Sequence, residues 1–143
     1  MVDGSPETCW MSQQVNQSLI LYRTFHLIII QGLPQFIQLG FDENVIPTRL
    51  SITFQGGFVG TRCKVLVTTK DKDKTDWQLL TTVYPEDVNR PQVFDLKPAN
   101  PDILEDVKKG VSTFKLLFEE SSDFFGRITI YDLKVEGRRA QLL

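Results

Sequence analysis

The sequence is poor in the residues that most catalytic and metal sites need. It has one histidine, His26, and two cysteines, Cys9 and Cys63. One histidine excludes a histidine-rich metal centre and leaves little room for a serine–histidine or cysteine–histidine catalytic device. The two cysteines are too few for a disulfide framework and lack metal-ligand spacing. Motifs for phosphate binding or hydrolysis are also missing, so we predict that the protein is not an enzyme.

The chain also lacks a dominant charge and a long hydrophobic run. Its 143 residues carry 16 Lys and Arg against 18 Asp and Glu, a net charge of −2. Because nucleic acid binding needs clustered basic residues, we predict no direct nucleic acid binding. The most apolar segment, Leu19–Ile30, is interrupted by Arg23 and His26 and is shorter than the roughly 20 residues of a membrane span. It predicts an interior strand or a loosely attached insert. The N-terminus shows no signal-peptide pattern.

Beyond this segment the sequence consists of short runs with β character. The chain length fits one domain, and 41% hydrophobic and 24% charged residues are typical of a globular protein. Residues 1–14 are polar and turn-rich. Strand-like periodicity occurs in residues 36–39, 49–55, 63–69, 77–84, 92–96, 113–119 and 127–136. Such a series, with hairpin-length connections, predicts an antiparallel sandwich or jelly roll.

One helix is predicted near residue 100. Asn100 suits the N-cap, and Pro101 suits the first helical position. Lys108 and Lys109 suit the negative end of the helix, and Gly110 suits its left-handed termination. The predicted helix has about three turns.

The last predicted strand changes its apolar phase. Ile128 and Ile130 share one phase, whereas Tyr131, Leu133 and Val135 share the other. Either both faces of this strand are covered, or a bulge near Tyr131 shifts the register.

Three segments carry strings that are rare in combination. They are Asp3–Ser12 (DGSPETCWMS), Leu50–Phe58 (LSITFQGGF) and Asp123–Gly137 (DFFGRITIYDLKVEG). The pattern D-G-x-x-x-T-x-W-x-S, followed by a P-Q-x-I-x-L strand, is similar to discoidin domains, the coagulation factor five/eight type C group. With Tyr84–Asp87 (YPED), the strings resemble small intracellular members that associate with an orphan nuclear receptor. The likeness covers residues 3–14 and 32–137. It implies an all-β, galactose-binding-like jelly-roll sandwich with one short helix.

The chain departs from this family in two places. Family members carry more chain before the D-G motif, including the opening strand, so we expect residues 1–143 to form a single, N-terminally truncated domain. Such a domain would have an edge strand without its partner. Residues 15–31 match nothing in the family. Every valine codon begins with GU and one glutamine codon is CAG, so Val15 to Gln31 fits a retained intron; a genuine loop is the alternative.

The resemblance implies a non-enzymatic protein-interaction module with an orphan nuclear receptor as partner. In the family this means repression of transactivation by interference with DNA binding, in nucleus and cytoplasm. We expect contacts from three loops at one end of the sandwich, residues 55–62, 84–90 and 119–126. The candidate binding residues are Phe58, Arg62, Glu86, Asp87, Asp123 and Phe124. Asp123, Glu119 and Arg127 are expected to brace the final hairpin by ion pairing.

Two alternatives stay open. The first is a glycan- or calcium-binding, lectin-like module, because many discoidin-like carbohydrate binders hold a structural calcium at the D-G loop. A last-strand carboxylate closes that site, and the corresponding residues here are Asp3, Ser5, Thr8 and Asp132. Asp-Gly-Ser is equally an ordinary turn, and no other cofactor is predicted. The second alternative is an isoform without a stable fold.

Overall fold

The computed structural model describes residues 7–15, 18–30, 32–70, 72–73 and 75–140, with the backbone alone up to residue 27. The elements in this part of the chain are the strands β1 (Glu7–Val15), β2 (Ser18–Ile30), β3 (Gln35–Phe54), β4 (Gly60–Thr69), β5 (Gln78–Val83), β6 (Pro91–Asp95), β7 (Val111–Ser121) and β8 (Ile128–Arg139), a 3-10 turn (Pro101–Ile103) and the helix α1 (Leu104–Lys108). All strand pairs are antiparallel. The prediction of an all-β antiparallel fold with one short helix is confirmed.

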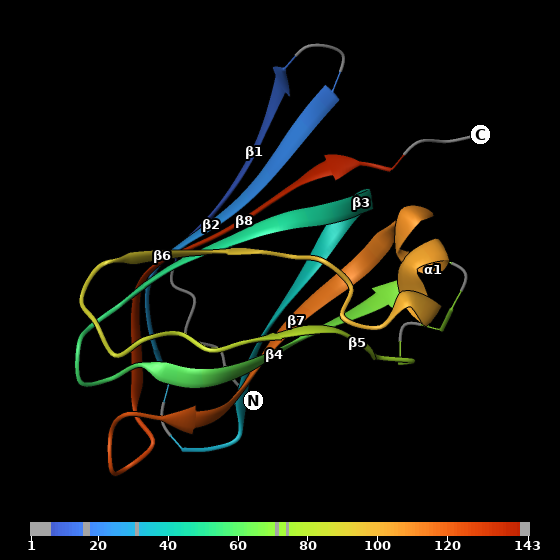
Figure 1. The fold of residues 1–143 in the computed structure, drawn as a ribbon. Coiled ribbons are helices and arrows are strands. Elements are labelled where there is room, and N and C mark those ends of the chain that lie inside the picture. The colour runs from blue at the N-terminus through green and yellow to red at the C-terminus, as the bar shows by residue number, and fades with distance from the viewer. Residues whose placement is uncertain (1–6, 16–17, 31, 71, 74, 141–143) are drawn as a thin grey trace.

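The long strand β3 joins the two layers of the sandwich. Its first part pairs with β7, its register shifts between Gly40 and Val45, and its second part pairs with β8 and β6. The order along the sheet is β1-β2-β8-β3-β7-β4-β5, with β6 also on β3. Figure 1 shows β6 and the second part of β3 lying over β4 and β5. Two of the predicted strands, residues 36–39 and 49–55, are therefore one bent strand.

The core lies between the two layers. Alternate residues in the paired parts of β3 and β7 point inward, which places Phe54 of β3 and Phe118 of β7 edge to face, with ring centroids 6.2 Å apart. The thiol of Cys63 lies in the same core, and burial raises its pKa well above its ordinary value. The fully buried large side chains are Phe54, Phe114, Phe118, Ile28, Leu39, Leu50, Ile52, Leu80, Leu116, Ile128, Ile130 and Leu133.

Most of residues 15–31 forms strand β2. This strand pairs with β1 on one side and with β8 on the other, where Ile28 lies opposite Ile130. Ile28 and Ile30 are buried in the core, whereas Ile29 between them is 61% exposed. Of the two expectations for this segment, an interior strand and a loosely attached insert, the structure shows the interior strand.

The N-terminal region was the least accurate part of the secondary-structure prediction. Residues 1–14 were expected to be turn-rich, but residues 7–15 form β1. Their backbone groups pair with β2, from Glu7 opposite His26 to Val15 opposite Ser18. A polar composition does not prevent a strand where a neighbouring strand satisfies its backbone hydrogen bonds.

The helix begins and ends where predicted but is shorter than expected. The Asn100 side chain accepts a hydrogen bond from the Asp102 amide at 3.0 Å, and Gly110 has a φ of 119°. A Cβ at Gly110 would also lie 2.4 Å from the Cβ of Asn44, so this position requires glycine. The first turn is 3-10, and α1 covers only Leu104–Lys108. No helix in the described residues is long and apolar enough to cross a membrane.

Strand β8 contains the bulge that its apolar phases suggested. Ile130 and Leu133 are both buried, whereas Tyr131 between them is exposed. The register against β3 shifts at this point, with Thr53 opposite Asp132 and Phe54 opposite Ile130. The bulge therefore lets both apolar phases of the strand face the same core.

Candidate functional site

Three loops meet at the end of the sandwich opposite α1 (Figure 1). They are residues 55–59 between β3 and β4, residues 84–90 between β5 and β6, and residues 122–127 between β7 and β8. The amide of Gly56 donates to Oδ1 of Asn89 at 3.0 Å, and the amide of Gly57 donates to Oδ1 of Asp87 at 2.8 Å. These bonds join the first loop to the second.

The first loop is also joined to the third. The amide of Val59 donates to Oγ of Ser122 at 2.9 Å, and the amide of Ser122 donates to the Val59 carbonyl at 2.9 Å. The amide of Thr129 donates to the Phe58 carbonyl at 3.0 Å. All three loops are thus parts of one hydrogen-bonded surface.

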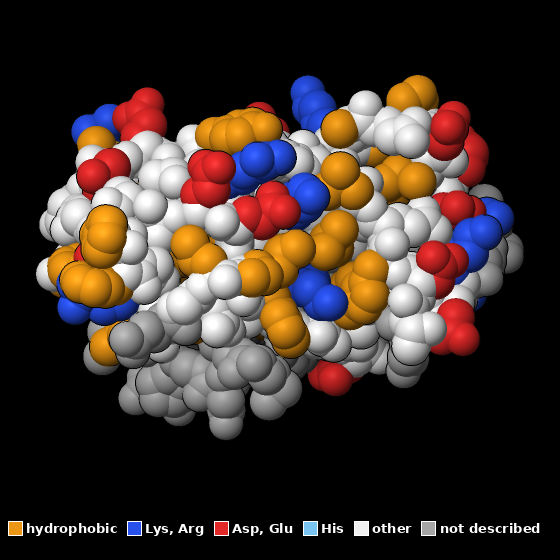
Figure 2. All heavy atoms as spheres, turned by 90° about the horizontal axis from the view of Figure 1, so that it is seen from below, with side chains coloured by type: hydrophobic (Ala, Val, Ile, Leu, Met, Phe, Trp, Pro, Cys, Tyr) orange, Lys and Arg blue, Asp and Glu red, His pale blue; other side chains and the backbone are white. Residues whose placement is uncertain are grey.

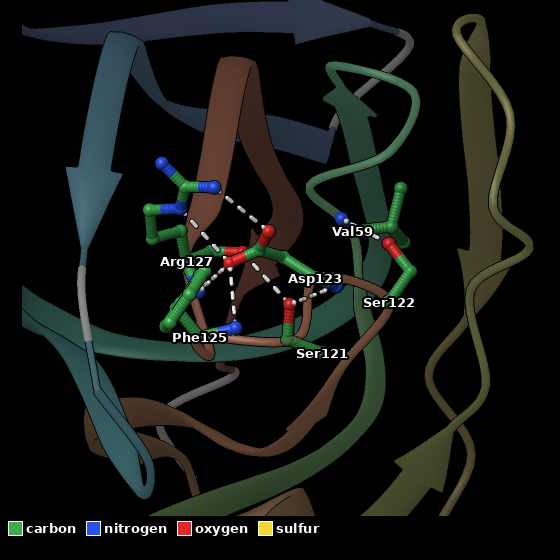
Figure 3. Close-up of polar contacts among 6 residues, drawn as sticks. All are labelled: Val59, Ser121, Ser122, Asp123, Phe125 and Arg127. Carbon is green, nitrogen blue, oxygen red and sulfur yellow. Dashed lines mark hydrogen bonds and ion pairs between the residues drawn. The ribbon is translucent and has the colours of Figure 1, made fainter.

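The carboxylate of Asp123 organises the third loop (Figure 3). It accepts hydrogen bonds from Arg127, with Nε 2.9 Å from Oδ2 and Nη2 3.0 Å from Oδ1. Oδ2 also accepts from the amides of Phe125 and Arg127 at 3.1 and 3.0 Å. Charge-assisted hydrogen bonds of this kind are stronger than those between neutral groups, and the bidentate geometry also fixes the orientation of the pair. The expected brace between Asp123 and Arg127 is confirmed.

This loop presents two adjacent phenylalanine rings to solvent. Phe124 is 92% exposed and Phe125 is 67% exposed, and their centroids lie 5.1 Å apart in an edge-to-face arrangement. The guanidinium of Arg127 lies 5.5 Å from the Phe125 ring and 5.1 Å from the Phe58 ring. We call Phe124 and Phe125 the aromatic tip. Its backbone is held by Asp123, and Phe125 also contacts Arg127.

Two of the other candidate binding residues, Phe58 and Asp87, connect the loops. Phe58 is half-buried beneath Arg127, and the Asp87 carboxylate holds the Gly57 amide. Glu86 is exposed and lies 3.4 Å from Arg90. Of the six candidates, only Phe124 is an exposed ring at the end of the loop surface.

The expected role of Glu119 in the brace is wrong. Its carboxylate lies 3.3 Å from Nε of Arg62 and 3.2 Å from Nζ of Lys64, on the neighbouring strand β4. Arg62 also lies 3.9 Å from Glu120. The register between β4 and β7 decides these partners. The candidate residue Arg62 therefore belongs to an ion-pair cluster on the strands beside the loops.

Sequence reasoning missed three residues of this surface. Phe125 completes the aromatic tip, and Asn89 joins two loops. Leu33 is exposed, and its Cγ lies 3.2 Å from where a Cβ of Gly126 would be. The string Asp123–Gly126 (DFFG) indicates that Phe125 is exposed together with Phe124, since it places two large apolar residues within a turn. No local signal brings Leu33 to this turn.

The possible calcium ligands fall largely outside what the structure describes. Asp3 and Ser5 lie outside the described residues, and Thr8 is described by its backbone alone, in β1. Asp132 lies in β8, and β2 separates these two strands in the sheet. In the described residues, no group of three or more His, Cys, Asp or Glu side chains could hold a metal ion.

Acid is expected to weaken the brace. Hydrogen bonds from Arg127 lower the pKa of Asp123 from 3.8 to about 2. Because the folded-state pKa is depressed, the contribution of the carboxylate to stability is full above pH about 4 and is lost as the pH falls towards 2. The unfolding free energies of wild type and Asp123→Asn, measured with urea, should therefore differ above pH 4 and converge below it.

The matched control is Asp95→Asn, because the exposed Asp95 lies 3.9 Å from Arg49 in a longer ion pair. This variant shows how an Asp→Asn replacement in a longer, exposed ion pair changes the unfolding free energy over the same pH range. A difference between wild type and Asp123→Asn that does not change from pH 6 to pH 2 would contradict the assigned brace.

The chain is similar in sequence to several nuclear receptor 2C2-associated proteins. It is 32% identical to the Danio rerio protein over 139 residues, which cover 97% of this chain and 78% of the relative. For the Mus musculus protein the identity is 32% over 98% of this chain and 79% of the relative. For the Homo sapiens protein it is 30% over 97% and 78%. The chain belongs to the nuclear receptor 2C2-associated protein family.

The comparisons with family models and with solved structures do not contribute to this family assignment. No family model matches the chain. Among solved structures, a family 29 carbohydrate-binding module is similar with a TM-score of 0.43 and 12% identity, over 94% of this chain and 82% of that one. A second module, from Piromyces equi, gives 0.41 and 11%, over 94% and 80%. The nuclear receptor 2C2-associated proteins, matched along nearly the whole chain, therefore carry the family assignment.

Proposed function

We propose that the chain binds a nuclear receptor through the aromatic tip and the loops around it. The observation that carries this proposal is the exposure of Phe124 and Phe125 on a turn fixed by Asp123. Adjacent apolar rings are left in water at a cost, and such exposed clusters mark interaction sites. Aromatic residues are also enriched among the residues that dominate binding energies. The names of the relatives support a nuclear receptor as the partner.

The ion pair between Asp123 and Arg127 favours binding through the aromatic tip. A protein interface must offset the entropy lost when its loops and side chains become ordered. Here the carboxylate of Asp123 already holds the backbone of Phe125, and the guanidinium of Arg127 contacts its ring. The tip therefore presents its backbone in a fixed conformation, and little ordering of the loop remains to be done on binding.

We further propose that binding represses the receptor by interfering with its contact to DNA, in nucleus and cytoplasm. The chain has a net charge of −2. A chain with this slight negative charge, bound at or beside a DNA-binding surface, adds a weak repulsion towards the phosphate backbone. The same charge balance predicts that the chain does not bind DNA by itself.

A gel-shift experiment with purified nuclear receptor 2C2 and labelled DNA carrying its binding site tests this mechanism. Adding the full chain should reduce the fraction of DNA bound by the receptor several-fold, and the chain alone should leave the DNA unshifted at low salt. A slower-migrating ternary complex with unchanged DNA affinity would contradict interference. Salt-sensitive DNA binding by the chain alone would contradict the prediction that the chain does not bind DNA by itself.

A further inference from the structure

The outer face of one layer of the sandwich carries several apolar residues. In β7 the side chains of Phe114, Leu116 and Phe118 point into the core. Because side chains alternate along a strand, Lys115 and Leu117 point outward. The solvent-facing side of an antiparallel sheet is usually polar, yet apolar residues recur on this side.

The strand register gathers these residues into one patch. Lys115 lies opposite Gln38 of β3 and Leu66 of β4, and Leu117 lies opposite Phe36 of β3. All of these except the exposed Gln38 are half-buried. Figure 2 shows hydrophobic side chains gathered around a basic one on the face of the molecule seen from below, beside a cluster of acidic and basic side chains. The patch therefore combines apolar surface with a central cation.

Among the residues that the register brings together, the cation is Lys115. Its ammonium lies 4.1 Å from the centroid of the Trp77 ring and 4.9 Å from that of the Phe36 ring. Both distances are within the range of cation–π attraction. No ion pair joins Lys115 to a carboxylate in the described part of the chain, whereas Glu119 lies 3.2 Å from the neighbouring Lys64. Within the described residues, the positive charge at the centre of the patch therefore has no ion-pair partner.

We propose that this surface, formed by Phe36, Leu66, Trp77, Lys115 and Leu117 and here called the Lys115 face, binds a protein segment that presents a carboxylate flanked by apolar side chains. The carboxylate pairs with the ammonium, and the flanking side chains cover the rings and leucines. Covering the pair removes water, which strengthens the attraction between the charges. The ammonium already lies close to both rings, which disfavours a sugar stacked against them. This site is separate from the aromatic tip and does not depend on it.

Selection of binders from a random peptide display library tests the proposal. The target is the full chain carrying Phe124→Ala and Phe125→Ala, so that binding to the tip cannot contribute. A second target carries Lys115→Glu in addition, and a third carries Lys115→Met, which keeps an apolar side chain of similar length without its charge. Circular dichroism confirms that the three targets are folded.

The selected peptides should contain Asp or Glu flanked by Leu, Phe or Trp. Lys115→Glu should weaken their binding at least tenfold, and Lys115→Met should abolish their preference for Glu over Gln at the central position. Peptides without acidic enrichment, no selected peptides at all, or binding that is unchanged in Lys115→Glu would overturn the proposal. The same targets are titrated with mannohexaose while their amide resonances are recorded. If mannohexaose perturbs the resonances of the Lys115 face and no acidic peptide does, the face binds glycans and the proposal is wrong.

Discussion

Replacing Ile28 by aspartate is expected to unfold the protein, whereas the same replacement at Ile29 is expected to leave it folded. The Ile28 side chain has no solvent exposure, and that of Ile29 is 61% exposed. A charge buried without a partner costs upwards of about 4 kcal/mol, a large part of the roughly 5–15 kcal/mol that stabilises a domain. An exposed substitution usually changes stability by less than about 0.5 kcal/mol. Circular dichroism during heating, together with amide resonance dispersion, distinguishes the two outcomes.

This pair of substitutions tests whether residues 15–31 belong to the fold. Ile28 and Ile29 are adjacent and chemically identical, so a difference in outcome reflects their different burial, which the alternation of a strand predicts. Ile28→Val is a further control, since it removes a single methylene at a cost of about 0.5–1.5 kcal/mol and should remain folded. A loosely attached loop would tolerate aspartate equally at both positions, and that result would contradict the assignment of β2.

The predicted strands show how much of the fold follows from local pattern. Alternation identified the strands that form the core, such as β7 with its inward Phe114 and Phe118. It did not identify β1, whose polar residues are held in a strand by pairing with β2. It also divided β3 in two, because the register shift between Gly40 and Val45 is set by its partner strands. Pairing across the sheet, which local pattern does not encode, accounts for these errors.

In the candidate site, too, local contacts were predicted and contacts between strands were not. The resemblance to discoidin domains indicated which loops lie at one end, and the structure brings those loops together. Sequence spacing correctly paired Asp123 with Arg127, which are four residues apart within one turn. The partners of Glu119 depend on the register between β4 and β7, and those were missed. Contacts within a loop were predictable, whereas contacts between strands were not.

Removing the aromatic tip is expected to abolish most of the binding to the receptor. Replacing Phe124 and Phe125 together by alanine removes two exposed rings without touching Asp123 or the core. Aromatic residues at the centre of an interface commonly contribute 2 kcal/mol or more, and about 1.4 kcal/mol corresponds to a tenfold change in affinity. We therefore expect the dissociation constant to rise by at least about 30-fold. The melting temperature should change little, because neither ring is in the core.

The control for this substitution is Leu104→Ala. Leu104 is an exposed apolar residue in α1, at the end of the sandwich opposite the tip. Its replacement also removes exposed apolar surface, but from a region that is not proposed to contact the receptor. The affinity for the receptor should therefore stay within about twofold of wild type, because residues outside the contact contribute little.

Isothermal titration of the full chain with purified nuclear receptor 2C2 tests the central claim most directly. The account predicts that wild type and Leu104→Ala bind with similar affinity, and that the variant lacking both tip rings binds far more weakly while remaining folded. Equal affinity of the tip variant and the wild type, or no binding by the folded wild type, would contradict it.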